Sequence, residues 1–325
     1  MFLKRWKSLW NPEMFQGWGK KQPYFEGWYY KIVDKNEQNA MAIIPAITID
    51  ARGSQPFVQV MDGKNCLAFN YKFEANQFWS ANDRFKVKIG DNEFSGNKLK
   101  VDFPNLKADL EFKETTAFPK HLMAPGVMGW YSFVPFMECY HGVVSVHHQV
   151  EGKVKWRGDI IDYSGGKGYI EKDWGRSFPN SWIWAQSNHF DQEDVSFMIS
   201  IAKIPWLGSS FIGFLGFLKI KNRVHRFATY TGARIKHTSV DNINKVVTIE
   251  LKSRKHVLNI LVEGDQNSFS ELIAPADGMM TAKVNESLKA KVNIEFKEKG
   301  NLIFKGEGRN SGFEIGGEYK ELLVN

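Results

Sequence analysis

Short runs in which apolar and polar residues alternate recur along most of this chain, and this periodicity constrains the fold more than any other feature. Residues 107–114 (KADLEFKE) place Ala108, Leu110 and Phe112 on one side and charges on the other, as a half-buried strand does. Strands at intervals of about 8 to 12 residues are typical of antiparallel sandwiches and barrels. The sequence therefore predicts an all-β chain. Further alternating runs and turn sequences support this prediction: 245–252, 256–264, 292–300, 301–308, Gly90-Asp91-Asn92 and Lys299-Gly300-Asn301.

The N-terminal residues depart from this pattern. In residues 1–12 (MFLKRWKSLWNP) large apolar side chains recur at helical spacing beside a basic face, which predicts a short N-terminal helix. This helix either packs on the body of the protein or lies in a membrane interface. The segment lacks the separate basic and apolar regions of a signal peptide. The longest apolar stretch, residues 206–218, is too short for a transmembrane helix.

The chain has 325 residues, which allows one large domain or two of ordinary size. A glycine-rich loop at residues 162–168 lies at the midpoint. An aromatic run opens each half, FEGWYYKIV at 25–33 and SWIWAQSNHF at 181–190. These features predict two similar antiparallel β-domains, residues 1–165 and 166–325.

Charge and motif content exclude several function classes. The net charge of +7 comes from cations interspersed with acids, so we expect no nucleic-acid partner. The motifs of P-loop, serine hydrolase and dinucleotide-binding proteins do not occur. Cys66 and Cys139 show no metal-binding spacing and favour the reducing cytosol. His141, His147 and His148 form only a weak metal pattern, so we predict ordinary strand or core histidines and no metal site.

Acidic residues embedded among aromatic residues are the candidate catalytic groups. Period two places Glu26 on one strand face with Trp28 and Tyr30, where a carboxylate is costly unless it is paired or protonated. The same logic puts Glu171 and Asp173 on one face. Tyr169 lies on this same face. Glu138 is a further candidate acid, because it lies in the aromatic segment 129–142.

A structural role remains open for each acid. Glu26 and Glu171 either serve in chemistry or form salt bridges with cations such as Lys172 or Arg176.

The strand at residues 181–190 resembles the wall of a pocket. Trp182, Trp184, Gln186 and Asn188 share one face, which combines ring surface with amide groups. Aromatic residues make up 14% of the chain, enough to enclose a bulky apolar ligand.

Four segments stand out along the chain: FEGWYYK (25–31), PFMECYHG (135–142), GYIEKDWGRSFPNSWIWAQSNHF (168–190) and FEIGGEY (313–319). In this order they resemble the signatures of tocopherol cyclases and their bacterial relatives. The resemblance extends from about residue 11 to residue 319, and its long central motif is specific. Carotenoid hydratases are more distant members with a comparable acid-x-(Asp/Asn)-Trp-Gly element.

The resemblance implies a fold of two lipocalin-like β-barrels side by side, with an apolar cleft between them. It also implies a chemistry in which an isoprenoid double bond is protonated without a cofactor. In tocopherol cyclases the phenolic oxygen of a prenylated quinol then closes on the tertiary cation. Glu171 and Glu26 match the family pattern. Asp173 departs from it, because plant-type cyclases have a sequence similar to Glu-Lys-Asn-Trp-Gly, with Asn at this position.

We therefore predict that Glu171 is the leading proton donor, with Glu26 as a second candidate catalytic acid. Asp173 supports Glu171 by raising its pKa through like-charge repulsion. Gln186 and Asn188 are expected to hold the quinol oxygen. Tyr140, Trp182 and Trp184 are expected to face the developing cation. The other residues expected to line the substrate site are Trp28, Tyr30, Glu138 and Trp174.

Two main function classes stay open, and a third, a membrane-associated structural protein, rests only on the aromatic basic N terminus. The first is an enzyme that cyclises, isomerises or hydrates a prenylated apolar substrate. The second is a non-catalytic carrier of a lipid, quinone or isoprenoid, which needs an apolar cleft and no buried acid. In both cases the expected partner is a hydrophobic small molecule. We expect a cytoplasmic protein, with peripheral contact to the inner membrane face as an additional expectation from the basic N terminus.

Overall fold

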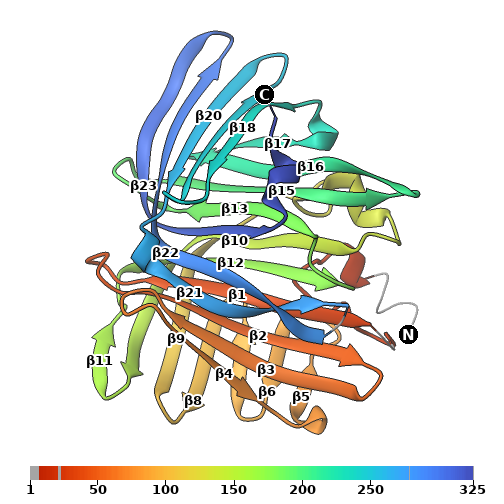
Figure 1. Cartoon of the computed structure of the whole chain (residues 1–325). Helices are drawn as coiled ribbons and strands as arrows, with labels where there is room; N and C mark the ends of the chain where they lie inside the picture. Colours follow the sequence, from red (N-terminus) through yellow and green to blue (C-terminus); the bar gives the residue numbers. More distant parts are fainter. Residues whose placement is uncertain (1–6, 21–22, 278, 325) are drawn as a thin grey trace. The chain divides into compact units, whose positions relative to one another are not determined.

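The computed structural model describes residues 7–20, 23–277 and 279–324. Strands dominate the chain (Figure 1), and the all-β prediction is confirmed. Of the predicted N-terminal helix (residues 1–12), residues 7–9 form a short helical turn that residues 10–12 do not continue, and residues 1–6 lie outside the described part of the chain. No helix in the described residues is long and apolar enough to cross a membrane. The 3-10 helices are η1 (Ala75–Gln77), η2 (Gly129–Phe133), η3 (Thr229–Thr231), η4 (Gln266–Ser268) and η5 (Tyr319–Leu322).

The first antiparallel sheet is curled and has twelve strands in the order β4-β3-β2-β1-β12-β10-β9-β8-β7-β6-β5, with β11 paired to β10. Its centre therefore consists of β1, β12 and β10, which come from both ends of the sheet's sequence. The strands are β1 (Tyr24–Val33), β2 (Ala40–Asp50), β3 (Gly53–Asp62), β4 (Leu67–Lys72), β5 (Phe78–Ser80), β6 (Lys86–Ile89), β7 (Asn92–Ser95), β8 (Lys98–Phe103), β9 (Leu106–Ala117), β10 (Cys139–Trp156), β11 (Asp159–Asp162) and β12 (Gly166–Gly175).

The second antiparallel sheet has eleven strands in the order β17-β16-β15-β13-β23-β22-β20-β19-β18, with β14 paired to β23 and β21 paired to β22. Two curled antiparallel sheets agree with the predicted pair of lipocalin-like barrels. The strands are β13 (Ser181–Ser187), β14 (His189–Phe190), β15 (Val195–Trp206), β16 (Ser209–Ile220), β17 (Arg223–Ala228), β18 (Arg234–Asp241), β19 (Val246–Lys252), β20 (His256–Glu263), β21 (Phe269–Ala276), β22 (Met279–Glu298) and β23 (Asn301–Gly317).

The alternating runs form strands for the reason that the sequence indicates. In β9, Ala108, Leu110 and Phe112 are buried in the first core, while the intervening charged residues are exposed. The turn between β22 and β23 consists of Lys299 and Gly300, both with positive φ (51° and 86°). This geometry suits a two-residue hairpin, because its twist matches that of the strands it joins.

The chain divides into two compact units, each with its own hydrophobic core. The first comprises residues 1–62, 67–178 and 273–283, and the second comprises residues 63–66, 179–272 and 284–325. The sequence placed a domain boundary at residue 165, but the loop there joins β11 to β12 within the first sheet. Because β12 pairs with both β1 and β10, it belongs to the first unit, and the boundary near the middle of the chain lies after Phe178.

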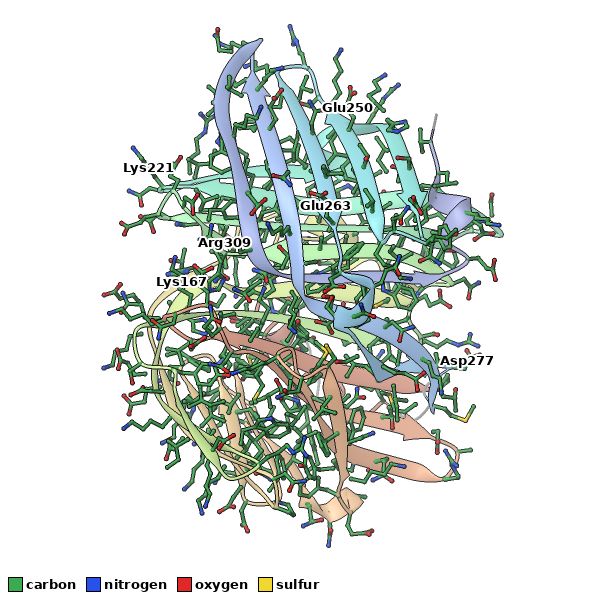
Figure 2. All side chains as sticks on the ribbon, turned by 60° about the vertical axis from the view of Figure 1, so that its left-hand side comes forward. Lys167, Lys221, Glu250, Glu263, Asp277 and Arg309 are labelled. Carbon is green, nitrogen blue, oxygen red and sulfur yellow. The ribbon has the colours of Figure 1, made fainter. Side chains whose placement is uncertain are left out.

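Both cores are built from side chains that alternate inward along the strands. The first contains Trp28 and Leu110, and the second contains Ile249 and Phe313. Charged side chains such as Lys221 and Glu263 are exposed to solvent (Figure 2). This distribution is that of two ordinary cores and leaves buried charges as the features that need an explanation.

Candidate functional site

Strand β12 presents two chemically different faces. Ile170 belongs to the first core and Trp174 packs against it, so Lys172, which alternates with them, shares this inner face. Glu171 and Asp173 alternate with these residues and lie on the opposite, outer face. Residues 171–173 of the predicted catalytic motif therefore place the two acids on one side of the sheet and the lysine on the other.

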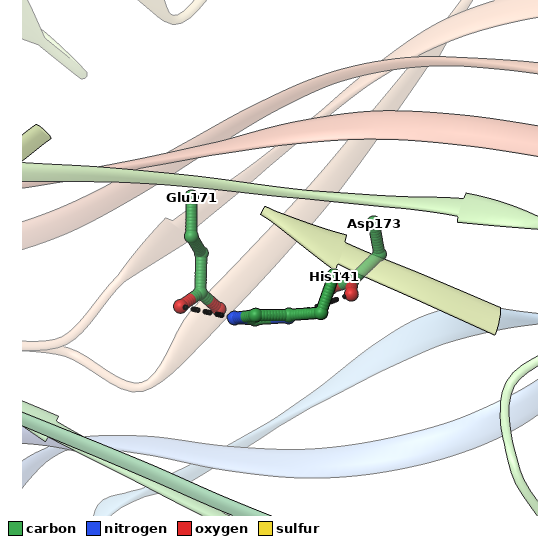
Figure 3. A group of neighbouring side chains, drawn as sticks. All are labelled: His141, Glu171 and Asp173. Carbon is green, nitrogen blue, oxygen red and sulfur yellow. Dashed lines mark hydrogen bonds and ion pairs between the residues drawn. The ribbon is translucent and has the colours of Figure 1, made fainter. Parts of the chain in front are cut away.

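A histidine from the neighbouring strand β10 joins the two acids. His141 is the register partner of Asp173, so its side chain lies on the same outer face. Its Nδ1 lies 2.8 Å from Asp173 Oδ1, and its Nε2 lies 3.4 Å from Glu171 Oε2. Figure 3 shows the imidazole between the two carboxyl groups. The hydroxyl of Tyr169 donates a hydrogen bond of 2.7 Å to Glu171 Oε2. We call Tyr169, Glu171, Asp173 and His141 the outer cluster.

The outer cluster is shielded from water and can carry a proton between its members. The side chains of His141 and Glu171 are 11% and 6% exposed, and that of Asp173 is 26% exposed. Burial opposes a charge on His141, but the nearby carboxyl groups of Asp173 and Glu171 prevail and raise its pKa well above the usual value. The imidazole is thus held as an imidazolium near neutral pH, within reach of a second proton-binding group.

The donor set of the outer cluster is a poor fit for a metal ion. His141, Glu171 and Asp173 offer one ligand atom each, and these atoms lie within 4.8 Å of one another. Asp173, however, contacts Nδ1 while Glu171 faces Nε2, so one ion cannot use the same imidazole nitrogen with both acids. An ion on Nε2 would have two protein ligands with Asp173 behind the ring, fewer than the three of a typical catalytic zinc site.

The inner face of β12 carries a buried ion pair. Lys172 Nζ lies 2.6 Å from Glu26 Oε1, and both side chains are fully buried. Burial raises the pKa of Glu26 and lowers that of Lys172, and their mutual attraction opposes both shifts. Glu26 also accepts hydrogen bonds from the Tyr24 hydroxyl and from the backbone N–H of Gln16. For Glu26, the structure thus provides the salt bridge with Lys172 that the structural alternative predicted.

The ion pair holds the N-terminal strap, residues 7–18. Lys172 Nζ donates to the carbonyl oxygens of Pro12 (2.8 Å) and Met14 (2.5 Å), and it lies 4.6 Å from the ring centre of Trp174. Lys172 therefore uses all three of its N–H donors.

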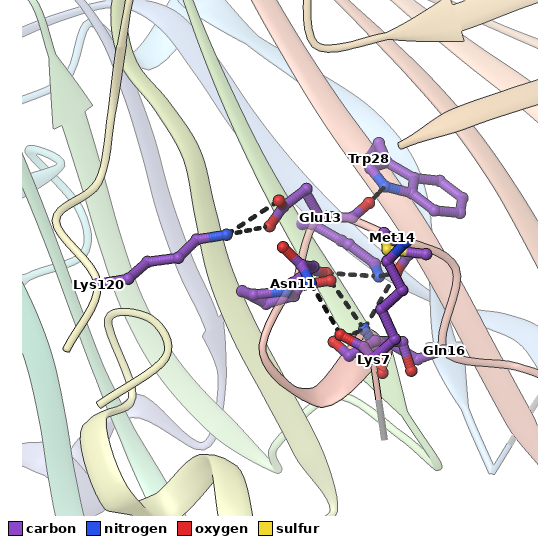
Figure 4. A network of polar contacts seen from close by, with 10 residues as sticks. Lys7, Asn11, Glu13, Met14, Gln16, Trp28 and Lys120 are labelled. Carbon is purple, nitrogen blue, oxygen red and sulfur yellow. Dashed lines mark hydrogen bonds and ion pairs between the residues drawn. The ribbon is translucent and has the colours of Figure 1, made fainter. Parts of the chain in front are cut away.

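Further bonds fasten the strap to strands and to itself. Trp28 Nε1 donates to the Glu13 carbonyl at 2.8 Å, and the Glu13 carboxyl pairs with Lys120 at 2.8 Å (Figure 4). Gln16 Nε2 donates to the carbonyl oxygens of Ser8 and Met14. These bonds and the contacts with the buried pair fix the position of the strap.

Four of the predicted substrate-site residues lie away from the outer face. Trp28 and Tyr30 are fully buried in the first core, and the Tyr30 hydroxyl donates to the Ser95 carbonyl at 2.9 Å. Tyr140 stacks on Trp174, with ring centres 5.5 Å apart, on the inner side. Because period two separates the two faces, these rings cannot contact a ligand held at Glu171 without a change in the sheet.

Glu138 is placed outside the outer cluster. Its side chain is half-buried, and burial raises its pKa against the opposing charge of Arg176. Its carbonyl accepts the N–H of Arg176 at 2.8 Å, which ends β12.

The remaining predicted residues belong to the second unit. Trp182, Trp184 and Gln186 alternate with the core residues Ile183 and Ala185 of β13, and so share the face opposite the second core. Trp182 Nε1 donates to Glu314 Oε2 at 2.7 Å. Trp184, Gln186 and Asn188 are all buried.

Sequence reasoning missed two residues of the outer face. His141 was noticed only as a weak metal candidate, because its pairing with Asp173 depends on a register that sequence does not reveal. Tyr29, which is 9% exposed, is the register partner of Glu171 in the pairing of β1 with β12. Sequence does not reveal this register either.

Comparisons with known proteins point to one family. A family model described as tocopherol cyclase-like matches residues 104–317. The chain is 32% identical over 231 residues to the chloroplastic tocopherol cyclase of Zea mays, an alignment that covers 53% of this chain and 48% of that protein. The chain thus spans about half the length of this curated relative.

Solved structures share the fold at low sequence identity. CghA matches with a TM-score of 0.55 and 8% identity, covering 91% of this chain and 89% of CghA. A protein from Nitrosomonas europaea assigned as AttH matches with a TM-score of 0.51 and 15% identity, covering 91% of this chain and 93% of the other. At these identities the likeness concerns the fold alone.

Proposed function

The chain belongs to the tocopherol cyclase-like family, and from this premise we propose that it is a cofactor-free cyclase that protonates the alkene of a prenylated quinol. The proton creates a tertiary cation, and the phenolic oxygen closes the ring on that cation. The observation that supports this proposal is the outer cluster, in which His141 lies between two carboxyl groups on a shielded sheet face.

The reaction needs one proton donor and one proton acceptor. The alkene carbon gains a proton, the carbon–oxygen bond forms, and the phenolic oxygen loses its proton, so the substrate ends with the same number of hydrogens. The proton of the His141 imidazolium first moves from Nε2 across the 3.4 Å to Glu171 Oε2, which gives a protonated Glu171 and a neutral His141. Glu171 donates this proton to the alkene, and His141 accepts the phenolic proton at Nε2, which restores the imidazolium and the Glu171 carboxylate.

Asp173 and Tyr169 prepare this pair. Asp173 binds Nδ1 at 2.8 Å, which fixes the ring orientation and keeps Nε2 directed at Glu171. The hydroxyl of Tyr169, whose pKa is raised by burial and by Glu171, stays protonated and donates to Glu171. Asp173 is therefore a positioning residue here, which agrees with an Asn at this place in plant-type cyclases.

Aromatic rings on the same face suit the developing cation. Tyr29 and Tyr169 lie beside Glu171 across and along the strands, and the face of a tyrosine ring stabilises a cation by roughly 0.5 to 2 kcal/mol. They take the role that the sequence analysis assigned to Tyr140, Trp182 and Trp184.

Turnover in deuterated water tests the proposal. The purified chain is incubated with prenylated benzoquinols of several chain lengths, and the products are analysed by mass spectrometry and NMR. We expect a cyclised product that carries one deuterium on the former alkene carbon. Glu171→Gln should abolish this product, while Glu111→Gln, a change of an exposed glutamate on β9, should leave it unchanged.

Two outcomes would reject the enzyme. If no chain length yields a cyclised product, the cyclase is excluded. If the quinol binds with equal affinity to the wild type and to Glu171→Gln without conversion, the chain is a carrier, the alternative function that needs no acid.

A further inference from the structure

The first unit contains a cavity that the proposed reaction does not use. Its volume is about 460 Å³, within the range of about 300 to 1,000 Å³ that small-molecule sites occupy. The aromatic rings of Phe15, Trp18, Phe78 and Trp79 line it. None of these residues belongs to the outer cluster, so the cavity is a separate site.

Two chain segments form the walls of the cavity. Phe15 and Trp18 come from the end of the N-terminal strap, and Phe78 and Trp79 come from β5. The ring of Phe15 lies 5.0 Å from that of Phe78 and 5.2 Å from that of Trp18, centre to centre. Phe15 is part of the first core, whereas Trp79 is 49% exposed. The cavity thus has a firm apolar floor and a solvent-facing aromatic edge.

The strap wall is held in place from within the first unit. Lys172 binds the carbonyl oxygens of Pro12 and Met14, and Glu26 binds the backbone N–H of Gln16, so the backbone is held on both sides of Phe15. A ring that enters the cavity therefore meets a preformed surface, which lowers the entropy cost of binding.

The charges around the cavity cancel each other. Asp83 and Arg84 are the charged side chains among its lining residues, and Arg84 Nη1 lies 3.0 Å from Asp83 Oδ2. Both are more than half exposed, so the pair contributes little to binding. An ion would have to compete with this internal pair, whereas an uncharged ring would not.

We propose that this cavity is a second small-molecule site, which takes an uncharged aromatic compound between the strap and β5. Trp79 forms the outer side of the site and Trp18 the strap side. The inference goes beyond the proposed cyclase, because it concerns binding at another place in the first unit and requires no turnover.

Two matched fluorescent probes test the site on the full chain. N-phenyl-1-naphthylamine is uncharged, and 8-anilinonaphthalene-1-sulfonate adds a sulfonate to the same ring system. Affinities are measured by titration with direct excitation of each probe. We expect saturable binding of the uncharged probe and weaker binding of the sulfonate. A sulfonate that binds equally or more tightly would overturn the assignment of an uncharged ligand.

Substitutions locate the bound probe. Trp79→Ala and Trp18→Ala should each weaken binding of the uncharged probe about tenfold, because each removes a large ring from the site. Trp79→Phe should restore most of the affinity. Trp130→Ala removes another exposed tryptophan (43% exposed) outside the cavity lining and should have no effect. If Trp79→Ala binds the probe as the wild type does, the cavity is not the site and the proposal fails.

Discussion

The two faces of β12 hold buried acids in opposite ways. On the inner face, Glu26 pairs with Lys172 at 2.6 Å, and every donor of the lysine has an acceptor. On the outer face, Glu171 and Asp173 share one imidazole, which gives two acids and a single base. The inner pair balances its charge, whereas the outer cluster has an excess of proton-binding groups.

The balance of charge around a buried acid distinguishes a structural acid from a reactive one. Glu26 and Glu171 are both buried and both lie near aromatic residues in the sequence, so burial alone does not show which acid is structural and which is reactive. A balanced pair that is also bonded to backbone groups resists any change of protonation. A cluster with several protonation states of similar energy is suited to proton transfer.

Removing the inner cation should have the largest effect. Lys172→Met leaves Glu26 buried without its partner and frees the strap, so we expect the free energy of unfolding to fall by about 3 to 5 kcal/mol. Urea denaturation followed by circular dichroism measures this. Lys167→Met, on the same strand but partly exposed, should change stability by less than about 0.5 kcal/mol. Equal effects of the two substitutions would contradict the structural role of the pair.

Removing the imidazole from the outer cluster should impair turnover more than folding. His141→Gln eliminates the acceptor of the phenolic proton, and we expect kcat to fall by about 100-fold. Steady-state kinetics with a prenylated benzoquinol measures this effect. A variant that keeps its full kcat would remove His141 from the mechanism.

The pH dependence of stability reports the state of His141. Its pKa in the folded protein lies well above the ordinary 6.5, so the folded state binds more protons than the unfolded state between these two values. The stabilisation is therefore complete below pH 6.5 and is lost as the pH rises toward the folded pKa. The stability difference between the wild type and His141→Gln should shrink there by at most about 1.4 kcal/mol per pH unit. A difference that does not change with pH would contradict the imidazolium.

Changing the second acid should have the smallest effect. Asp173→Asn keeps an oxygen that accepts from Nδ1, and we expect kcat to fall less than about tenfold, because Asp173 orients the ring without contacting the reacting atoms. The same variant should move the alkaline limb of the pH–rate profile to lower pH, because one of the two negative charges beside His141 is lost. A loss of activity as large as that of His141→Gln would make Asp173 a direct participant.

The sequence could predict the strands and the candidate acids, but not which side chains from different strands meet on each face of the sheet. Period-two patterns identified β9 and the strands of the second sheet, because one face of each is buried and the other is solvated. The pattern also placed Glu171 and Asp173 together on one side of β12, where the structure has them.

Long-range pairing is the part that could not be predicted. The sheet brings β1 and β10 to either side of β12, across sequence separations that no local pattern encodes. His141 and Tyr29 reach Glu171 by this pairing, and Lys172 reaches Glu26 by it. Trp174 lies on the inner side, although its sequence neighbour Asp173 is an acid of the outer face.

A side-by-side comparison of Glu26→Gln and Glu171→Gln tests most directly whether the two faces have separate roles. Unfolding by urea and deuterium incorporation into the cyclised product are measured for both variants. We predict that Glu26→Gln lowers the free energy of unfolding by about 3 to 5 kcal/mol, and that Glu171→Gln lowers it by less than about 1 kcal/mol and abolishes the product. A Glu171→Gln variant that unfolds as readily as Glu26→Gln, or that still forms the deuterated product, would contradict this account.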